Sequence, residues 1–137
     1  MINIVFDENN KLKLEEKIFE LNFNRLDGGL EEPIIKLSSI TPIKELVDKY
    51  DGKDITVYIV GYGRDDNYEA FSAMLYPTDS FTSRFESPKI LISKSTRKTY
   101  KGASINSLKF WPLMEPFVID GKLEITAKDE TGKRGKQ

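Results

Sequence analysis

The amino-acid sequence predicts an α+β fold, with antiparallel sheets and two short helices. Three observations predict it: short apolar segments that alternate with period two, two segments that begin like capped helices, and turn residues between them. A chain of 137 residues is long enough for one domain with an ordinary core. We expect one α+β domain over residues 1–126 and a disordered basic tail over residues 127–137, which holds no large apolar side chain.

The first half predicts four strands followed by a helix. Residues 2–6, 11–15, 19–23 and 33–37 alternate or cluster apolar side chains and are separated by turn residues, so each is expected to be a strand. Residues 42–50 carry apolar side chains at i, i+3, i+4 and i+7, which indicates a short amphipathic helix.

This helix has start and stop signals. Thr41 suits the N-cap and Pro42 suits the first helical position, where a missing N–H matters least. Gly52 supplies the stop.

The second half predicts three strands, a second helix and a hairpin. Residues 54–60, 68–76 and 89–93 are expected to be strands. Residues 68–76 also fit a helix begun by a capping box, but the turn before them and the proline after them favour a strand. Residues 104–116 indicate a short helix, and Asp-Gly between apolar runs predicts a hairpin over residues 117–125.

The sequences around the two expected helices resemble each other. Each begins with a Ser-Ile pair and is followed by Asp-Gly-Lys, at residues 51–53 and 120–122. The similarity predicts a duplicated β-β-β-β-α unit, with halves 1–52 and 53–126, or else it reflects chance between two capped helix starts.

Composition restricts the chemistry open to this chain. It has no cysteine and no histidine, which excludes disulfides, thiolate nucleophiles and imidazole bases. We therefore expect a binding protein rather than an enzyme, with no cofactor and no metal. The carboxylates Asp65, Asp66 and Glu69 fit either a Mg²⁺ site or an ordinary turn, and the turn is favoured. No apolar run approaches membrane-spanning length and the N-terminus does not resemble a signal peptide, so cytoplasmic residence is expected.

Charge is divided unevenly along the chain. Residues 1–79 hold 9 Lys and Arg against 16 Asp and Glu, whereas residues 80–137 hold 12 against 6. The halves therefore carry net charges of −7 and +6, and a basic half is a typical footprint of polyanion binding.

The basic charge concentrates where aromatic residues also occur. Residues 84–111 contain seven cations and one carboxylate, together with Tyr100, Phe110 and Trp111. Proteins that bind single-stranded nucleic acid use cations along the phosphates and flat side chains against unpaired bases. The alternative is a solvated loop whose cations pair with the acidic half. We expect Trp111 to lie in the core, and Tyr58 to be a better stacking candidate because strand alternation turns it away from its apolar neighbours. Tyr62 and Tyr76 are similar but weaker candidates.

Residues 94–106, with a basic run, a Lys-Gly pair and a following Trp111, resemble the positive-cofactor-four and Whirly type of single-stranded DNA-binding proteins. This resemblance implies a curved four-stranded sheet plus a helix, repeated twice in Whirly proteins, single-strand binding across the sheet, and homodimers or homotetramers built through helices. Pro112 and Pro116 depart from it by interrupting the expected packing helix.

We therefore expect a single-stranded DNA-binding protein that acts in replication or recombination. The abundance of Ile, Lys and Asn suggests an AT-rich genome, such as that of a low-GC bacterium or its phage, and we expect a phage or mobile-element origin. The alternative is a small protein-binding accessory or inhibitor protein of a mobile element, in which the acidic half engages a basic protein. The residues expected to contact nucleic acid are Lys89, Lys94, Arg97, Lys98 and Lys101 for the phosphates, and Tyr58 and Tyr100 for the bases.

Overall fold

The computed structural model describes residues 2–21, 29–37, 43–76, 88–96, 105 and 108–126. Within these ranges the chain forms an α+β fold of two helices and six strands, so the predicted class is confirmed. The elements in order are β1 (Ile2–Val5), α1 (Glu8–Leu21), β2 (Ile34–Lys36), α2 (Lys44–Tyr50), β3 (Asp54–Arg64), β4 (Tyr68–Tyr76), β5 (Lys89–Lys94) and β6 (Phe110–Ile125).

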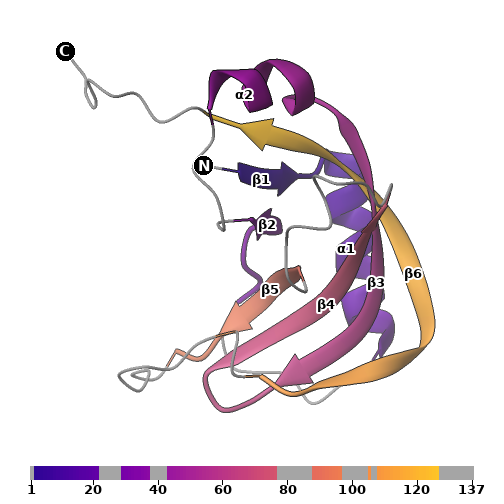
Figure 1. Cartoon of the computed structure of the whole chain (residues 1–137). Coiled ribbons are helices and arrows are strands. Elements are labelled where there is room, and N and C mark those ends of the chain that lie inside the picture. The colour runs from indigo at the N-terminus through magenta and orange to yellow at the C-terminus, as the bar shows by residue number, and fades with distance from the viewer. Residues whose placement is uncertain are drawn as a thin grey trace.

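All six strands belong to one antiparallel sheet, in the order β2-β1-β6-β3-β4-β5. The sheet curves so strongly that its two edges approach each other (Figure 1). The segment before β2 bridges β5 through Leu30 and Ser93, and the N–H of Glu31 donates to the carbonyl of Ile92 at 2.8 Å. The sheet is therefore a nearly closed barrel, and a single core of buried apolar side chains fills it.

Residues 8–21 form helix α1, so the strand predicted over residues 11–15 is wrong, as is the described part of the strand predicted over residues 19–23. Leu12 and Leu14 alternate with lysines as in a strand, yet Leu14 is buried and Leu12 is exposed on a helix. Leu14 and Ile18, four residues apart, share the face that enters the core. Period-two alternation over five residues was too short to exclude this helical spacing.

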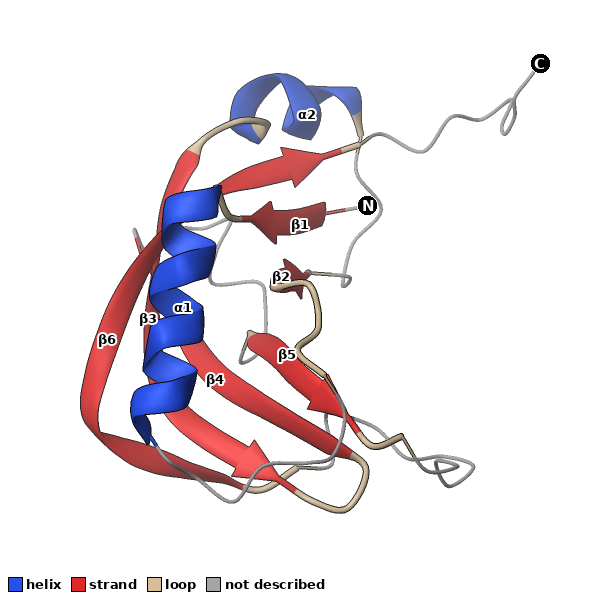
Figure 2. Ribbon diagram, turned by 180° about the vertical axis from the view of Figure 1, so that it is seen from behind, coloured by secondary structure: helices blue, strands red, loops and turns tan. Residues whose placement is uncertain are grey.

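Asp7 starts α1 as its N-cap. One carboxylate oxygen accepts both the backbone N–H and the side-chain amide of Asn10, each at 2.9 Å. These two donors hold the pKa of Asp7 below its ordinary value. The helix then runs alongside β6 (Figure 2), where Lys17 Nζ lies 5.7 Å from the centre of the Phe117 ring.

Helix α2 confirms the helix predicted over residues 42–50. Its observed N-cap is Ile43, which makes no side-chain capping bond, and the predicted cap Thr41 lies outside the described residues. Gly52 follows with a φ of 79°, a left-handed conformation that suits glycine, as the predicted stop requires. The helix packs apolar side chains against the core and lies across the end of β6 (Figure 1).

Strand β6 replaces two predicted elements. Residues 110–116 are strand rather than helix, and the hairpin predicted at Asp120-Gly121 is uninterrupted strand paired with β3. Gly121 serves close packing instead of a turn, because a Cβ there would lie 2.7 Å from Ile4 Cγ2 and 2.9 Å from the Val5 carbonyl oxygen.

The two prolines of β6 flank an irregular part of the strand. Ile59 pairs with Phe117 and Gly61 with Pro112, so residues 113–116 of β6 stand opposite Val60 alone. This bulge interrupts the ladder, which is where residues without a backbone N–H are tolerated in a sheet.

The chain halves do not repeat the same unit. Over the described residues, the half spanning 1–52 has the order β-α-β-α, and the half spanning 53–126 has four strands. The predicted β-β-β-β-α duplication is therefore wrong, because both similar helix starts were read from capping residues that recur at many kinds of turn. The predicted tail, residues 127–137, lies outside the described residues. Neither described helix is long and apolar enough to cross a membrane.

Candidate nucleic-acid interface

Strand alternation separates the two faces of β3. Ile55, Val57 and Ile59 point into the core and are buried, whereas Thr56 and Tyr58 point to the outer face of the barrel. Tyr58, which the sequence singled out for stacking, therefore lies on the outer face.

Strand β4 adds two large side chains beside Tyr58. The register pairs Tyr58 with Met74 and Thr56 with Tyr76, and cross-strand partners in an antiparallel pair share a face. The rings of Tyr58 and Tyr76 meet edge to face, with centroids 6.3 Å apart and planes at 90°. Tyr58 is 40% exposed and Tyr76 is 57% exposed, so both rings are accessible from solvent.

Strand β5 brings two cations to the same outer face. Lys89 pairs with Ser72 and Lys94 with Tyr68, two residues of β4 that alternate in step with Met74. Lys94 is exposed and Lys89 is half-buried. The five intervening steps separate their Cα atoms by roughly 16 Å along the strand. We call Tyr58, Tyr76, Lys89 and Lys94 together the outer-face cluster.

Phe110 lies beside Lys89 on this face. The register pairs Phe110 with Gly63, where a Cβ would approach Phe110 Cδ1 to 2.9 Å and the Lys109 carbonyl oxygen to 2.6 Å. Lys89 Nζ lies 5.7 Å from the centre of the Phe110 ring, within cation–π range. The bare backbone at Gly63 thus lets an aromatic ring pack flat on β3 next to a cation.

Trp111 does not lie in the core, so that prediction is wrong. Its side chain is 62% exposed. The neighbouring Leu113 supplies the buried apolar side chain of this stretch. As the residue after Phe110 in an extended strand, Trp111 leaves β6 on the other side, and we do not include it in the outer-face cluster.

The remaining predicted contacts, Arg97, Lys98, Tyr100 and Lys101, lie outside the described residues. The segment that carries them begins directly after Lys94 and Thr96. The backbone N–H of Ser95 donates to the Asn67 carbonyl at 2.9 Å, so the end of β5 is held to the turn between β3 and β4.

Two of the three carboxylates considered as a Mg²⁺ site, Asp65 in the turn after β3 and Glu69 in β4, have structural partners. Asp65 Oδ1 accepts the backbone N–H groups of Asn67 at 2.7 Å and Tyr68 at 2.8 Å, as in an Asx turn. Glu69 is fully buried, and its carboxylate accepts hydroxyl hydrogen bonds from Tyr62 and, at 2.7 Å, from Ser93. Tyr62 is thereby directed inward and is not a stacking candidate. No group of three or more carboxylates in the described parts of the chain is arranged to hold a metal ion.

One further lysine on the outer face is neutralised locally. Lys122 Nζ lies 2.7 Å from Asp54 Oδ1, and this hydrogen bond raises the pKa of Lys122 above its ordinary value. The carboxylates of Asp120 and Glu124 are exposed on the same face of β6, so the cations of the outer-face cluster lie away from this end, on β5.

Met74 and Phe110 were not assigned to this face from the sequence, and Tyr76 ranked below Tyr58. Alternation within residues 68–76 contained the signal for Met74 and Tyr76, since both are in phase with Ser72. The sequence contained no such signal for Phe110, because residues 104–116 were expected to form a helix.

Comparisons with protein-family models, with curated proteins and with solved structures found no match for this chain.

Proposed function

We propose that the protein binds single-stranded nucleic acid, with DNA as the expected form, through the outer face of β3, β4 and β5. The supporting observation is the outer-face cluster, in which an accessible pair of tyrosine rings shares one sheet face with two lysines. Stacked rings and phosphate-tracking cations are the two components that single-strand binding requires together.

The two components have separate tasks. Tyr58 and Tyr76 would stack on unpaired bases, which every base permits because each has a π-face. Lys89 and Lys94 would contact separate phosphates along the strand, and Arg97, Lys98, Tyr100 and Lys101 would extend the contact beyond β5. A duplex presents its bases stacked on one another, so the tyrosines gain nothing from it.

Binding of oligo-dT and of a duplex of equal length, measured by fluorescence anisotropy at low salt, tests the proposal. The single strand is expected to bind at least tenfold more tightly. The matched control is the double variant Lys13→Ala, Lys36→Ala, which removes two exposed lysines from other elements. The test variant is the double substitution Lys89→Ala, Lys94→Ala. Equal affinity for both nucleic acids, or an equal loss of single-strand affinity in the control and test variants, would contradict the proposal.

A role in replication or recombination of a phage or mobile element remains part of this proposal, as does assembly into homodimers or homotetramers. The Whirly-like resemblance now adds less to it than the outer-face cluster, because the described element order lacks the duplicated unit.

The second candidate function, a protein-binding accessory or inhibitor protein, is favoured by a different observation. Helix α1 exposes the carboxylates of Glu8, Glu15, Glu16 and Glu20 to solvent, far from β5 in sequence. Glu8 and Glu20 lie near Lys11 and Lys17 on the same helix, whereas Glu15 and Glu16 leave an exposed acidic face that is suited to a basic protein rather than to nucleic acid.

A further inference from the structure

Helix α1 carries a second stripe of side chains, on the face turned away from the core. Its members recur at i, i+4, i+7, i+8 and i+11, the spacing of one helix face, and all are exposed. We call this stripe the acidic stripe, and its members are Glu8, Leu12, Glu15, Glu16 and Phe19.

Two apolar side chains of the acidic stripe are unusually exposed. Leu12 is 52% exposed and Phe19 is 69% exposed. Seven residues separate them, so they lie two helical turns apart on the same line, at roughly 10 Å. Burying such side chains against a partner would remove apolar surface from water, which favours association.

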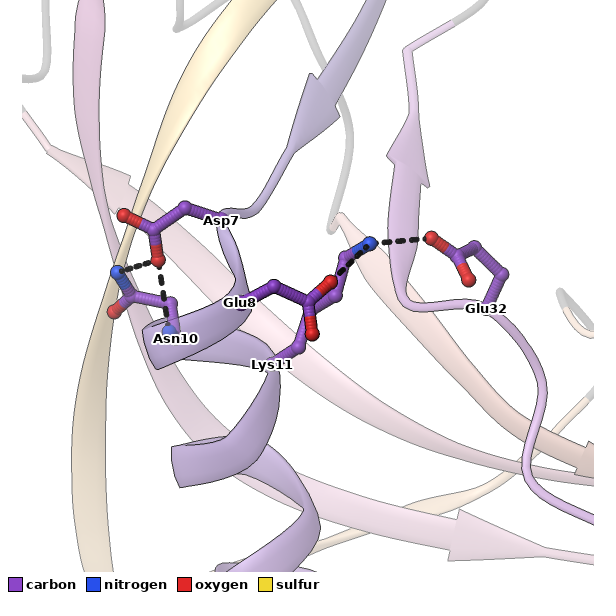
Figure 3. Close-up of polar contacts among 5 residues, drawn as sticks. All are labelled: Asp7, Glu8, Asn10, Lys11 and Glu32. Atoms are coloured by element: carbon purple, nitrogen blue, oxygen red, sulfur yellow. Dashed lines mark hydrogen bonds and ion pairs between the residues drawn. The ribbon is translucent and has the colours of Figure 1, made fainter.

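The charge of the acidic stripe has one sign. Its three glutamates face solvent, and none of its five members is a cation. At its edge, Lys11 Nζ lies 3.7 Å from Glu8 but 2.6 Å from Glu32 on the segment before β2 (Figure 3). The hydrogen bond to Glu32 raises the pKa of Lys11, so this lysine remains charged and is engaged within the fold.

We propose that the acidic stripe docks a cationic amphipathic helix of another protein. Apolar side chains of that helix would cover Leu12 and Phe19, and its Lys or Arg residues would pair with the glutamates, as charged flanks do beside the seam of paired helices. This inference gives the second candidate function a surface and a partner class, and it does not depend on nucleic-acid binding.

Two other occupants fit less well. A second copy presenting the same stripe across a twofold axis would bring carboxylates against carboxylates. The chain's own tail, residues 127–137, offers cations but no large apolar side chain to cover Leu12 and Phe19.

The test uses the full chain, labelled with ¹⁵N, and a synthetic helical peptide of about 18 residues, long enough to span α1. The peptide carries Leu every seven residues with Lys and Arg beside them, and a second peptide carries Glu in place of the cations.

We expect the cationic peptide to shift the NMR signals of the backbone amides of α1. We expect at least tenfold weaker binding in the variant Leu12→Ser, Phe19→Ser and in the variant Glu15→Lys, Glu16→Lys. The control Met74→Ser, which alters an exposed apolar side chain on the outer sheet face, should bind the peptide unchanged.

Circular dichroism confirms that each variant is folded, and both α1 variants alter exposed side chains only. Equal affinity for the two peptides, amide shifts outside α1, or unchanged affinity in the α1 variants would overturn the proposal. Self-association that Phe19→Ser abolishes in sedimentation velocity would assign the stripe to a second copy instead. Tighter peptide binding after removal of residues 127–137 would show that the chain's own tail occupies the acidic stripe instead. Oligo-dT binding is measured on the same α1 variants, so failure here is distinguishable from failure of the nucleic-acid proposal.

Discussion

At the scale of single residues, three tyrosines show how position decides role. Tyr58 and Tyr76 meet edge to face on the outer sheet surface, whereas the Tyr62 hydroxyl donates to the buried carboxylate of Glu69. Tyr58 and Tyr62 both belong to β3, and the register shift between Ile59 and Gly61 puts them out of phase. One extra residue in a strand thus separates an accessible ring from a structural one.

Truncation of the outer-face rings should weaken single-strand binding. Tyr58→Ala and Tyr76→Ala are each expected to cost about 1–3 kcal/mol, the usual effect of losing one stacked base, measured by anisotropy with oligo-dT. Tyr58→Phe should bind nearly as well, because the ring is kept. An unchanged affinity in the double alanine variant would show that the bases lie elsewhere.

Removal of the buried carboxylate should destabilise the fold. Glu69→Ala leaves the buried hydroxyl of Ser93 and the hydroxyl of the partly buried Tyr62 without this acceptor. We expect the free energy of unfolding, measured by urea denaturation, to fall by about 2–4 kcal/mol. Glu69→Gln keeps one acceptor oxygen, so its free energy of unfolding should fall by less. Equal losses in the two variants would mean that packing, not hydrogen bonding, fixes this site.

At the scale of elements, α1 joins the fold to its exposed surface. It fills the space beside β6 through Leu14 and Ile18, and the same helix exposes Leu12 and Phe19 on the opposite side. Asp120 donates its backbone N–H to Asn10 Oδ1 at 2.9 Å, so the first turn of the helix is fixed directly to β6. The stability of the acidic stripe therefore depends on the start of α1.

Loss of the N-cap should loosen α1 in a pH-dependent way. Asp7→Ala removes the acceptor of Asn10, and we expect the melting temperature at neutral pH to fall by roughly 3–5 °C. The folded pKa of Asp7 is lowered, so its contribution is present above the unfolded pKa and is lost as pH falls through the folded pKa. The difference between wild type and variant in thermal scans should therefore narrow below about pH 4. A difference that stays constant down to pH 2 would assign the effect to helix propensity alone.

At the scale of the whole molecule, the acidic and basic halves of the sequence contribute to two different surfaces. Part of the acidic half forms the exposed stripe of α1, and part of the basic half supplies Lys89 and Lys94 to the outer sheet face. Fields of opposite sign on different elements allow a chain with a net charge of −1 to attract both a polyanion and a basic protein.

The salt dependence of binding should report the number of phosphates contacted. Five contacts, expected from Lys89, Lys94, Arg97, Lys98 and Lys101, predict that log K falls with log salt with a slope of about −3.5 for a single strand. Lys94→Ala should reduce the magnitude of that slope by about 0.7. A slope near zero for oligo-dT would exclude a phosphate-tracking interface.

Local signals predicted part of this fold and of its candidate site. Helix α2 and strands β3, β4 and β5 were predicted because β-branched and aromatic runs, or a capped amphipathic turn, point to one structure in each case. Helix α1 was missed because Leu12 and Leu14 alternate as in a strand. The helical spacing becomes visible only when Leu14 is compared with Ile18, four residues later. The strand at residues 110–116 was missed because residues 104–116 were interpreted as a short helix interrupted by its prolines. In the structure these prolines belong to a strand, where a bulge accommodates them.

The sequence by itself determined the fold class, the period of most strands, the absence of histidine and cysteine chemistry, and the outward direction of Tyr58. Only the tertiary structure decided that Asp120-Gly121 continues a strand, that Trp111 is exposed, and that Tyr76 and Lys89 share a face with Tyr58. The physical reason is that period and propensity act between near neighbours in the chain. Register and burial depend on pairing partners far apart in sequence, such as Ile4 against Leu123, which no local pattern contains.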